Sequence, residues 1–389
     1  MKYCPNCGAE AADGARFCRH CGQLLPQPQG TPEAQPQSQP RAAQPQPTKP
    51  KIKPVGKRPD LYDSATAALN KYTGEEGAVK VNLIDLFSEV PKHHTKDEAE
   101  AIFIAGTKNT TPTLSDISDD WAKPWLFSRI LVGFLLAFAA LWVMAAEFQN
   151  ANAIPGLILV GAFAVPFSGL VFFFEADVFK DVSLFDVVKV FFIGGVFALI
   201  VTLFLYQFVS FSMMNRITGA LTVTDSLSVG LVEELGKFMI TLTFIDQLRV
   251  RHVLDGILIG AAVGAGFAAF ETAGYIYGSG NHLLEVAVLR GWSAIGGHLV
   301  WAAIAGGAFM VVKRQKAFQP SQLIDVRFLI FFLLAVLMHA AWDWDFTLFG
   351  SYTLKLIALI VLAWMIVFVL MNAGLKEITH LQEAEIKQP

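Results

Sequence analysis

Acidic, basic and imidazole side chains lie inside otherwise apolar stretches of the second half of the chain. A charged group at the centre of a bilayer costs at least about 2.5–3.5 kcal/mol, so each such residue needs a partner or a function. Carboxylates and imidazoles gathered together can hold a water molecule, remove its proton and stabilise the oxyanion formed when the water attacks a carbonyl carbon. The candidate catalytic residues are therefore Glu233, Glu234, Lys237, Glu271, Arg290, His298, His339 and Asp343.

Two simpler interpretations apply to any single residue of this set. It can belong to an ion pair that holds a helix bundle together, or it can line a proton or ion path in a transporter. The set as a whole favours a reaction site, because it combines acids, bases and cations. No serine or cysteine nucleophile is indicated, since this part of the chain has no cysteine and no Gly-x-Ser-x-Gly motif.

Helical spacing places some of these groups side by side. Glu233 and Lys237 are one turn apart on the same helix face, whereas Glu234 projects about 100° away from Glu233. His339 and Asp343 also stand at positions i and i+4 and share a face.

The elements that carry these residues are transmembrane helices by composition. The chain of 389 residues is 54% hydrophobic and 16% charged, whereas a soluble domain carries about 25% charged residues. Eight apolar stretches are each long enough to cross a hydrocarbon core about 30 Å thick. We predict an all-α polytopic membrane protein with about eight transmembrane helices, at 125–146, 153–174, 187–211, 226–245, 254–278, 284–312, 326–346 and 352–374.

Lysine and arginine are concentrated in alternate loops between these stretches. They follow the second, fourth and eighth stretches and border the loop after the sixth, while the opposite loops hold little beyond Arg216 and Lys355. Because cytoplasmic loops carry an excess of these residues, we expect a multi-pass protein of the cell membrane with both termini in the cytoplasm.

Depth in the bilayer follows from this topology. Counted from the outer helix ends at about 1.5 Å per residue, Glu233, Glu271 and His339 all lie roughly 10–12 Å below the outer surface. His298 lies deeper, near ~20 Å, by the same count. Four separate stretches thus bring costly groups toward the outer side of the membrane.

The amino terminus carries two Cys-x-x-Cys pairs, Cys4 with Cys7 and Cys18 with Cys21, each followed by glycine. Four thiolates in this arrangement suit tetrahedral Zn²⁺, and the alternative of a redox pair is disfavoured because no βαβ pattern surrounds either pair. We predict a structural zinc ribbon at residues 1–25, which would fold with its metal and offer a surface for a protein partner. A reducing cytosol would keep these thiolates free for zinc.

Composition divides the rest of the chain. The net charge of −3 disfavours nucleic acid as a partner. We expect a weakly structured juxtamembrane segment with one amphipathic helix, in which His93 and His94 are solvated rather than metal-bound. No signal peptide is indicated. The predicted parts after the ribbon are a Pro/Gln-rich disordered linker (26–59), the juxtamembrane segment (60–124), the membrane domain (125–375) and a cytoplasmic tail (376–389).

The order of the intramembrane motifs resembles that of the PrsW family of intramembrane proteases. The motifs are Glu-Glu-x-x-Lys (233–237), Phe-x-x-x-Glu (267–271), an Arg with a His eight residues later (290 and 298), and His-x-x-x-Asp (339–343). The family is distantly similar to the CAAX-protease and Abi group, which has Glu-Glu-x-x-x-Arg, Phe-x-x-x-His and His-x-x-x-Asn/Asp in the same order. The resemblance covers about residues 125–375.

The resemblance implies a bacterial enzyme that hydrolyses a peptide bond of a membrane-anchored protein, such as an anti-sigma factor, near the extracytoplasmic side. It implies that Glu233 is the general base and that Glu234 and Lys237 orient it or tune its pKa. Glu271 occupies the place of the second-motif histidine of the CAAX group and would bind the water or share a proton.

The resemblance also implies that His339 and Asp343 form an oxyanion-binding pair, whereas His298 has no counterpart in the CAAX pattern. PrsW-like proteins are commonly classed as metalloproteases, and two histidines with a glutamate suit catalytic zinc. No His-Glu-x-x-His motif is present, however, and the CAAX group is regarded as metal-free. We therefore favour water activation by glutamate and histidine without metal.

Two other classes of function stay open. A transporter or channel would spread its ionisable groups through the depth of the membrane. A membrane scaffold or sensor would use the zinc ribbon for its interactions and would have lost catalytic groups, whereas every motif residue is present here.

Overall fold

The computed structural model describes residues 2–3, 10–11, 60–107 and 109–387. The chain divides into two compact units, Met1–Lys57 and Arg58–Pro389. In the first, β1 (Lys2–Tyr3) pairs antiparallel with β2 (Glu10–Ala11). The predicted zinc ligands Cys4, Cys7, Cys18 and Cys21 and the predicted disordered linker lie outside the described residues.

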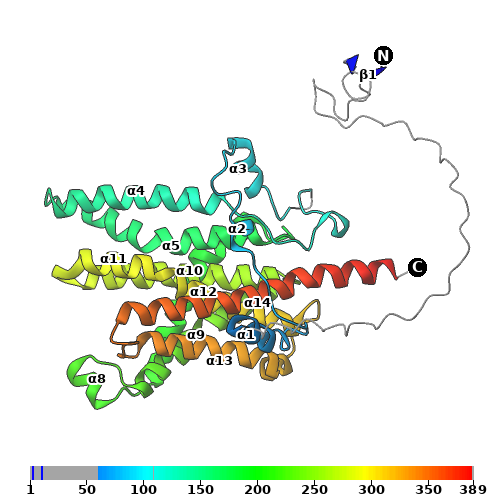
Figure 1. The fold of residues 1–389 in the computed structure, drawn as a ribbon. Helices are drawn as coiled ribbons and strands as arrows, with labels where there is room; N and C mark the ends of the chain where they lie inside the picture. The colour runs from blue at the N-terminus through cyan, green and yellow to red at the C-terminus, as the bar shows by residue number, and fades with distance from the viewer. Residues whose placement is uncertain (1, 4–9, 12–59, 108, 388–389) are drawn as a thin grey trace, which may run out of the picture. The chain divides into compact units, whose positions relative to one another are not determined.

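The second unit is a bundle of long helices, which run along a common direction in Figure 1. Apolar side chains from these helices form one large core and a smaller second cluster. The long helices are α4 (Leu126–Ala146), α5 (Ile154–Ala176), α9 (Val223–Gln247), α10 (Val253–Gly278), α12 (His298–Lys313), α13 (Val326–Asp343) and α14 (Tyr352–Ile386).

Shorter elements complete the unit. The third predicted stretch is not one regular helix, because a π-helical turn joins two α-helical pieces. The eighth continues as helix well past residue 374, into the predicted tail. The shorter elements are α6 (Leu184–Lys189), η3 (Val190–Gly194), α7 (Gly195–Leu205), α8 (Met213–Thr218), α11 (Leu283–Ser293) and the turns η1 (Leu114–Asp116), η2 (Ala151–Ala153), η4 (Tyr206–Phe208), η5 (Gly280–His282), η6 (Ala294–Gly296) and η7 (Pro320–Ile324).

Seven stretches of the described chain are long and apolar enough to cross a membrane. The helix α9, which is the fourth predicted span, has 25 residues but is not among the seven. Its middle carries Glu233, Glu234 and Lys237, and these charges exclude it by composition. It packs against α7, α10, α12 and α13 within the bundle. The multi-pass, all-helical prediction for this unit is therefore confirmed.

The central helix α10 is buried along almost its whole length and packs most extensively against α12. Glycines make this close approach possible. A Cβ atom added at Gly260 would meet the carbonyl oxygen of Ala302, and one added at Gly264 would meet that of His298. Small residues at four-residue spacing let helix backbones touch, as is usual in membranes. This packing holds the start of α12 against the second half of α10.

The sixth predicted span, 284–312, is broken rather than continuous. The helix α11 ends at Ser293, a 3-10 turn follows, and α12 begins at His298. The break lies at a Gly-Gly pair, and Gly297 adopts φ −96° and ψ −138°, which is not helical. A Cβ at Gly296 would collide with Ile360, so α14 packs tightly against the break. The break places His298 at the positive end of a helix.

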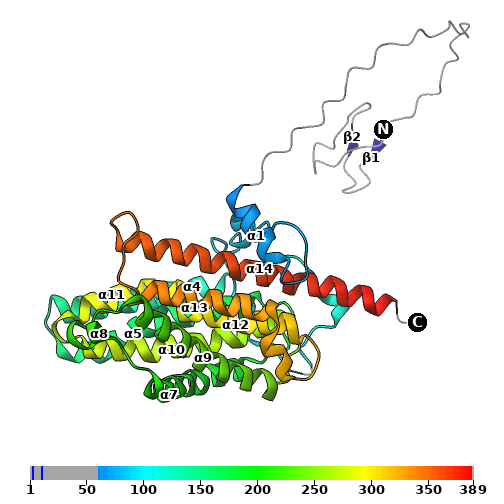
Figure 2. The ribbon, with the colours of Figure 1, turned by 90° about the horizontal axis from the view of Figure 1, so that it is seen from below.

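The juxtamembrane segment is folded, contrary to the expectation of weak structure. It contains α1 (Leu61–Asn70), α2 (Leu83–Leu86) and α3 (Lys96–Phe103). The helix α1 lies beside α14 in both ribbon views (Figures 1 and 2). Val79 and Leu86 are buried, and Val79 belongs to the large apolar core of the unit. Burial of these apolar side chains stabilises the segment in a way that local sequence does not show.

The two neighbouring histidines of this segment differ. His93 is exposed, as predicted. His94 is not solvated, since its ring stacks on Trp125 with a centroid distance of 3.8 Å and its side chain is only 11% exposed. The stacked pair joins the juxtamembrane segment to the start of α4.

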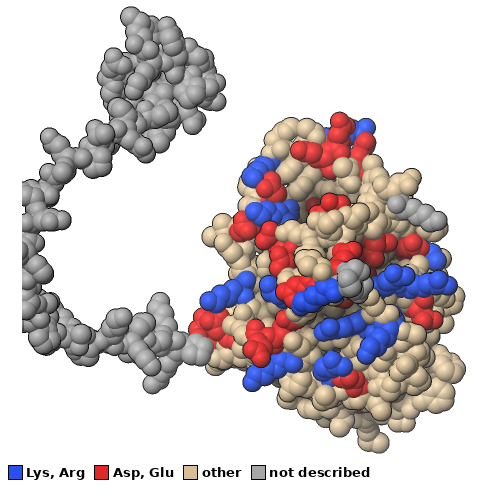
Figure 3. Space-filling view, turned by 90° about the vertical axis from the view of Figure 1, so that its right-hand side faces the viewer, with Lys and Arg blue, Asp and Glu red and all other residues tan. Residues whose placement is uncertain are grey.

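Charged side chains gather on the end of the bundle shown in Figure 3, where Lys and Arg lie among Asp and Glu. The side chain of Lys313, at the end of α12, donates to the carbonyl of Val250 after α9, so these two helix ends meet here. Exposed basic residues in this part of the chain include Arg249, Arg251, Arg314, Lys316 and Lys376.

Candidate active site

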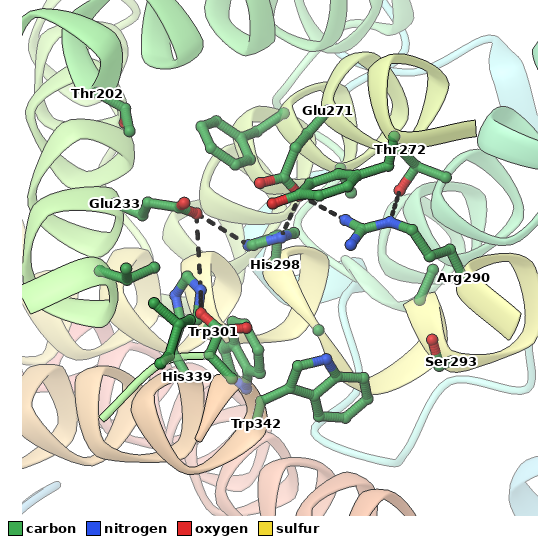
Figure 4. A pocket seen from close by; sticks show the side chains of 18 of the residues that line it. Thr202, Glu233, Glu271, Thr272, Arg290, Ser293, His298, Trp301, His339 and Trp342 are labelled. Carbon is green, nitrogen blue, oxygen red and sulfur yellow. Dashed lines mark hydrogen bonds and ion pairs between the residues drawn. The ribbon is translucent and has the colours of Figure 1, made fainter. Parts of the chain in front are cut away.

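A cavity of about 600 Å³ opens near the other end of the bundle, between η4, α9, α10, α11, α12 and α13. Figure 4 shows the side chains that face it. Six of the eight candidate residues line this cavity, and the other two, Glu234 and Lys237, lie behind them and are wholly buried. The six are Glu233, Glu271, Arg290, His298, His339 and Asp343. The predicted convergence of separate stretches is thus seen in the fold.

Glu233 occupies the middle of this cluster. Its Oε1 accepts a hydrogen bond of 2.8 Å from the hydroxyl of Tyr206. Its Oε2 is buried and has no hydrogen-bond partner, although it lies 3.6 Å from His339 Nε2 and 3.9 Å from His298 Nδ1. A buried carboxylate oxygen without a hydrogen bond destabilises the fold, so this atom is a candidate contact for a ligand.

Glu234 and Lys237 support the cluster from behind. Lys237 Nζ donates to Glu234 Oε1 at 2.7 Å and lies 3.9 Å from Glu233 Oε2. The closer partner is therefore the i−3 glutamate rather than the i−4 glutamate on the expected face, since a long lysine side chain reaches both neighbours. The same Oε1 of Glu234 lies 2.7 Å from His339 Nδ1.

His298 lies between two of these groups. Its Nε2 is 2.9 Å from Glu271 Oε2, and its Nδ1 is 2.7 Å from Lys237 Nζ. Arg290 Nη2 donates to the same Glu271 oxygen at 2.6 Å. Glu271 is thus held in an ion pair with Arg290, an arrangement better suited to orienting His298 than to the water-binding role that the resemblance implied.

The depth predicted for His298 was wrong. Its contacts with Glu271 and Glu233 place it at the level of these carboxylates rather than deeper in the bundle. The count along a continuous helix failed because α11 and α12 are separated by the break at residues 294–297.

His339 and Asp343 form the predicted pair on one helix face. His339 Nε2 lies 3.3 Å from Asp343 Oδ2, and the imidazole ring stacks on Trp301 with a centroid distance of 4.5 Å. His339 is 2% exposed, whereas the Asp343 side chain is 25% exposed. Asp343 is therefore the more accessible carboxylate of this pair.

Three contributors were not found from the sequence. Tyr206 lies 27 residues before Glu233 in a short turn, and no spacing rule links the two. Trp301 stands at position i+3 from His298 on α12, so helical spacing puts the two side chains side by side. The third is Thr272, which follows Glu271 in the chain. Its Oγ1 accepts a hydrogen bond of 3.3 Å from Arg290 Nε. Figure 4 shows Trp301 and Thr272 at the cavity.

Comparison with known proteins finds a family match that includes the residues of this cluster. Residues 185–371 match the family model of the PrsW family intramembrane metalloproteases. Residues 185–371 form a PrsW family domain. A second match, to a zinc-ribbon domain, covers residues 3–25 and agrees with the predicted ribbon. The PrsW match leaves out α4 and α5, although the resemblance was expected to extend over residues 125–375.

Individual PrsW relatives support the assignment. A Protease PrsW of Shouchella clausii is 28% identical over 192 residues, which is 49% of this chain and 84% of the relative. A Protease PrsW of Geobacillus kaustophilus is 25% identical over 202 residues, 50% of this chain and 77% of the relative. No solved structure matches. The chain is thus a PrsW-like intramembrane protease by its membrane domain.

The metal that the PrsW family description implies can be tested against the side chains present. Glu233, His298 and His339 each offer one ligand atom, and these atoms lie within 4.8 Å of one another. Two histidines and a glutamate are a donor set of catalytic zinc sites. Each imidazole also has one nitrogen on a carboxylate, Glu271 or Glu234, and the other nitrogen toward Glu233.

Such carboxylate–histidine pairs orient the imidazoles of metal sites. The donor set therefore fits a divalent metal. One contact opposes it, because Lys237 Nζ occupies the Nδ1 side of His298. Metal binding through Nδ1 requires the lysine to give up this contact and keep its bond to Glu234.

Proposed function

We propose that this chain is an intramembrane endopeptidase that cuts a membrane-anchored protein by water activated at Glu233, His298 and His339. The observation that carries the proposal is the buried, unpaired Oε2 of Glu233, which faces both imidazoles and borders the cavity. Hydrolysis needs a place for one water beside groups that can polarise it, and this atom lies at such a place.

Glu233, His298 and His339 would hold the metal, contrary to the metal-free mechanism that the sequence favoured. A bound divalent metal would lower the pKa of its water and polarise the scissile carbonyl. The His-Glu-x-x-His motif is not required for this donor set, because three helices supply by tertiary contact what that motif supplies from one. Glu234 and Glu271 hold the two imidazoles in the orientation needed.

Asp343 is the carboxylate that we assign to proton transfer. Its Oδ2 lies 3.3 Å from His339 Nε2, and its side chain is partly open to the cavity. It can accept the proton of the attacking water and return it to the leaving amine. Arg290, whose side chain is 28% exposed beside the cavity, offers positive charge to the oxyanion of the tetrahedral intermediate.

We further propose that the cavity faces the extracytoplasmic side and that both termini are cytoplasmic. The exposed basic residues near the ends of α9, α12 and α14 lie on the end of the bundle away from the cavity, and Figure 3 shows this end. Cytoplasmic ends carry such an excess of Lys and Arg. A substrate would then be cut close to its exit from the outer leaflet, as expected for an anti-sigma factor or a similar single-span protein.

We also propose that Cys4, Cys7, Cys18 and Cys21 bind a structural zinc, which is consistent with the zinc-ribbon match. The ribbon would offer a surface to a protein partner, whereas catalysis would belong to the membrane domain.

A transporter is a weaker alternative. An ion path needs polar groups through the depth of the membrane. The helix α10 carries Asp255 near its start and Glu271 near its end, and every residue between them is apolar or glycine. Along this buried helix the polar groups are therefore confined to the two ends.

The proposal is tested by co-expressing the full chain with candidate single-span membrane proteins and comparing the fragments on gels. Glu233→Gln should abolish the cleavage seen with the unsubstituted chain, because it removes the charge at the centre of the cluster. Glu285→Gln is the matched control, since Glu285 is exposed and pairs only with His282 on the surface. Equal cleavage by the Glu233→Gln and Glu285→Gln proteins would overturn the proposal.

A further inference from the structure

A second group of potential metal ligands lies at the opposite end of α10. Asp181 from the connection between α5 and α6 meets His252 and Asp255 at the start of α10. One ligand atom from each of the three lies within 4.8 Å of the others. Asp255 and Glu271 are sixteen residues apart, so about 24 Å of helix separates this group from the candidate active site.

The side chains of this group have buried atoms without partners. Asp255 is fully buried, and its Oδ1 accepts no hydrogen bond, while its Oδ2 is used by the backbone N–H of His252 at 3.0 Å. Asp181 Oδ1 and His252 Nδ1 are also buried without a hydrogen bond. Each of the three side chains thus has a buried polar atom without a hydrogen bond, and ligand atoms of the three lie close together. A shared ligand explains both observations best, because each such atom alone costs free energy.

The charges around this group favour a cation. Asp177, four residues before Asp181 in the chain, is buried, and Glu377 Oε1 lies 3.6 Å from His252 Nδ1. The nearby Lys180 directs its Nζ to the carbonyl oxygens of Phe174 and Glu175. Within the described residues, no lysine or arginine forms an ion pair with Asp181 or Asp255. Their negative charges therefore have no salt-bridge partner in this part of the chain.

The donor set selects the kind of ion. Carboxylate oxygens suit Mg²⁺, Ca²⁺ and Mn²⁺, whereas an imidazole nitrogen suits first-row transition metals. Two carboxylates with one imidazole therefore favour an ion such as Mn²⁺ or Zn²⁺ over Mg²⁺ or Ca²⁺. The His252 ring is held in place for this, since it stacks on Phe179 with a centroid distance of 3.7 Å.

We propose that Asp181, His252 and Asp255 bind a divalent first-row metal ion that ties together the α5–α6 connection and the start of α10. The last helix, α14, also contacts the start of α10. Glu377 of α14 accepts a hydrogen bond of 2.9 Å from the backbone N–H of Val253. The ion is structural, since it lies at the end of α10 far from the cavity. It stabilises the charged end of the bundle without taking part in peptide hydrolysis.

The test uses the full chain in detergent with the four ribbon cysteines and one ligand of the candidate active site replaced. The starting protein carries Cys4→Ser, Cys7→Ser, Cys18→Ser and Cys21→Ser together with Glu233→Gln. It is equilibrated with Mn²⁺, dialysed, and assayed for manganese by mass spectrometry and by electron paramagnetic resonance. We expect about one tightly bound Mn²⁺ per chain. Adding Asp255→Asn should weaken binding at least about tenfold, as loss of a ligand or its support does.

Asp186→Asn is the matched control, because Asp186 lies in the first turn of α6, just after the connection, and bonds only to Ser183. It should leave manganese binding unchanged. Asp181→Asn provides a second ligand variant if the Asp255→Asn protein fails to fold, since Asp181 lies on the connection rather than on the buried helix. Added Mn²⁺ should also raise the thermal unfolding temperature of the starting protein.

Either of two results would overturn the proposal. One is a starting protein that retains no manganese above the background of a metal-free blank and shows no thermal shift with Mn²⁺ or Zn²⁺. Such a result would mean that Asp181 and Asp255 share a proton instead. The other is undiminished manganese binding by both the Asp181→Asn and the Asp255→Asn proteins.

Discussion

Glu234 Oε1 lies 2.7 Å from His339 Nδ1, although the two residues are 105 positions apart in the chain. This contact leaves the other ring nitrogen, Nε2, directed toward Glu233 Oε2 at 3.6 Å. A wholly buried glutamate thus determines which atom of His339 is available for chemistry. His298 and Glu271 repeat the arrangement with the ring reversed, since there Nε2 meets the carboxylate. Its Nδ1 lies 3.9 Å from Glu233 Oε2 but also 2.7 Å from Lys237 Nζ.

Tyr206→Phe should lower the cleavage rate about tenfold or more while the protein stays folded. The substitution removes one hydrogen bond to the Glu233 carboxylate, and bonds to charged groups are worth about 1.5–3 kcal/mol. Rates are compared under single-turnover conditions with a cleaved substrate. Tyr277→Phe is the control, because Tyr277 is 80% exposed and should tolerate the change. An unchanged rate for Tyr206→Phe would remove this tyrosine from the site.

Lys237→Met should destabilise the protein by about 3–5 kcal/mol, because it leaves Glu234 charged and buried without its ammonium partner. The double substitution Lys237→Met with Glu234→Gln should recover part of this loss, since no unpaired charge then remains between these two positions. Unfolding free energies in detergent give the coupling between the two residues. Additive losses in the double variant would show that the 2.7 Å contact contributes no coupling energy.

Gly264→Ala should reduce both stability and cleavage. A Cβ at this position would meet the carbonyl oxygen of His298, so α12 must move away from α10. Overpacking of this kind costs about 1–3 kcal/mol. Gly274→Ala, on the same helix, has nothing within 4 Å of the added carbon and should be neutral or stabilising. The comparison is made by thermal unfolding and by cleavage rate. Equal behaviour of the two variants would contradict the close packing of α10 and α12.

Removal of metal should abolish cleavage by the chain in which the four ribbon cysteines are replaced by serine. A chelator takes away the ion that we assign to Glu233, His298 and His339, and readdition of Zn²⁺ should restore the rate. His298→Ala should lose both the metal and the activity. Full activity in protein shown to be free of metal would instead support direct water activation by Glu233, the mechanism that the sequence favoured.

Local periodicity was sufficient to place His339 and Asp343 on one face, because both lie on an uninterrupted helix where spacing determines direction. Counting depth from the outer helix ends put Glu233, Glu271 and His339 at one level, and all three line the cavity. It could not place His298 correctly, since the hydropathy of residues 284–312 does not reveal the break before α12. Hydropathy reports how apolar a stretch is, and a short non-helical turn can be as apolar as the helix around it.

Residue types and their order along the chain thus determined that this protein spans a membrane, which residues are costly there, and which family they resemble. The tertiary structure alone decided which nitrogen of each histidine faces Glu233, which oxygen of Glu233 has no hydrogen bond, and that Tyr206 touches Glu233. It also brought Asp181 to Asp255 from separate segments. The physical reason is that spacing controls contacts within one helix, whereas contacts between helices depend on crossing, packing and breaks that no single segment encodes.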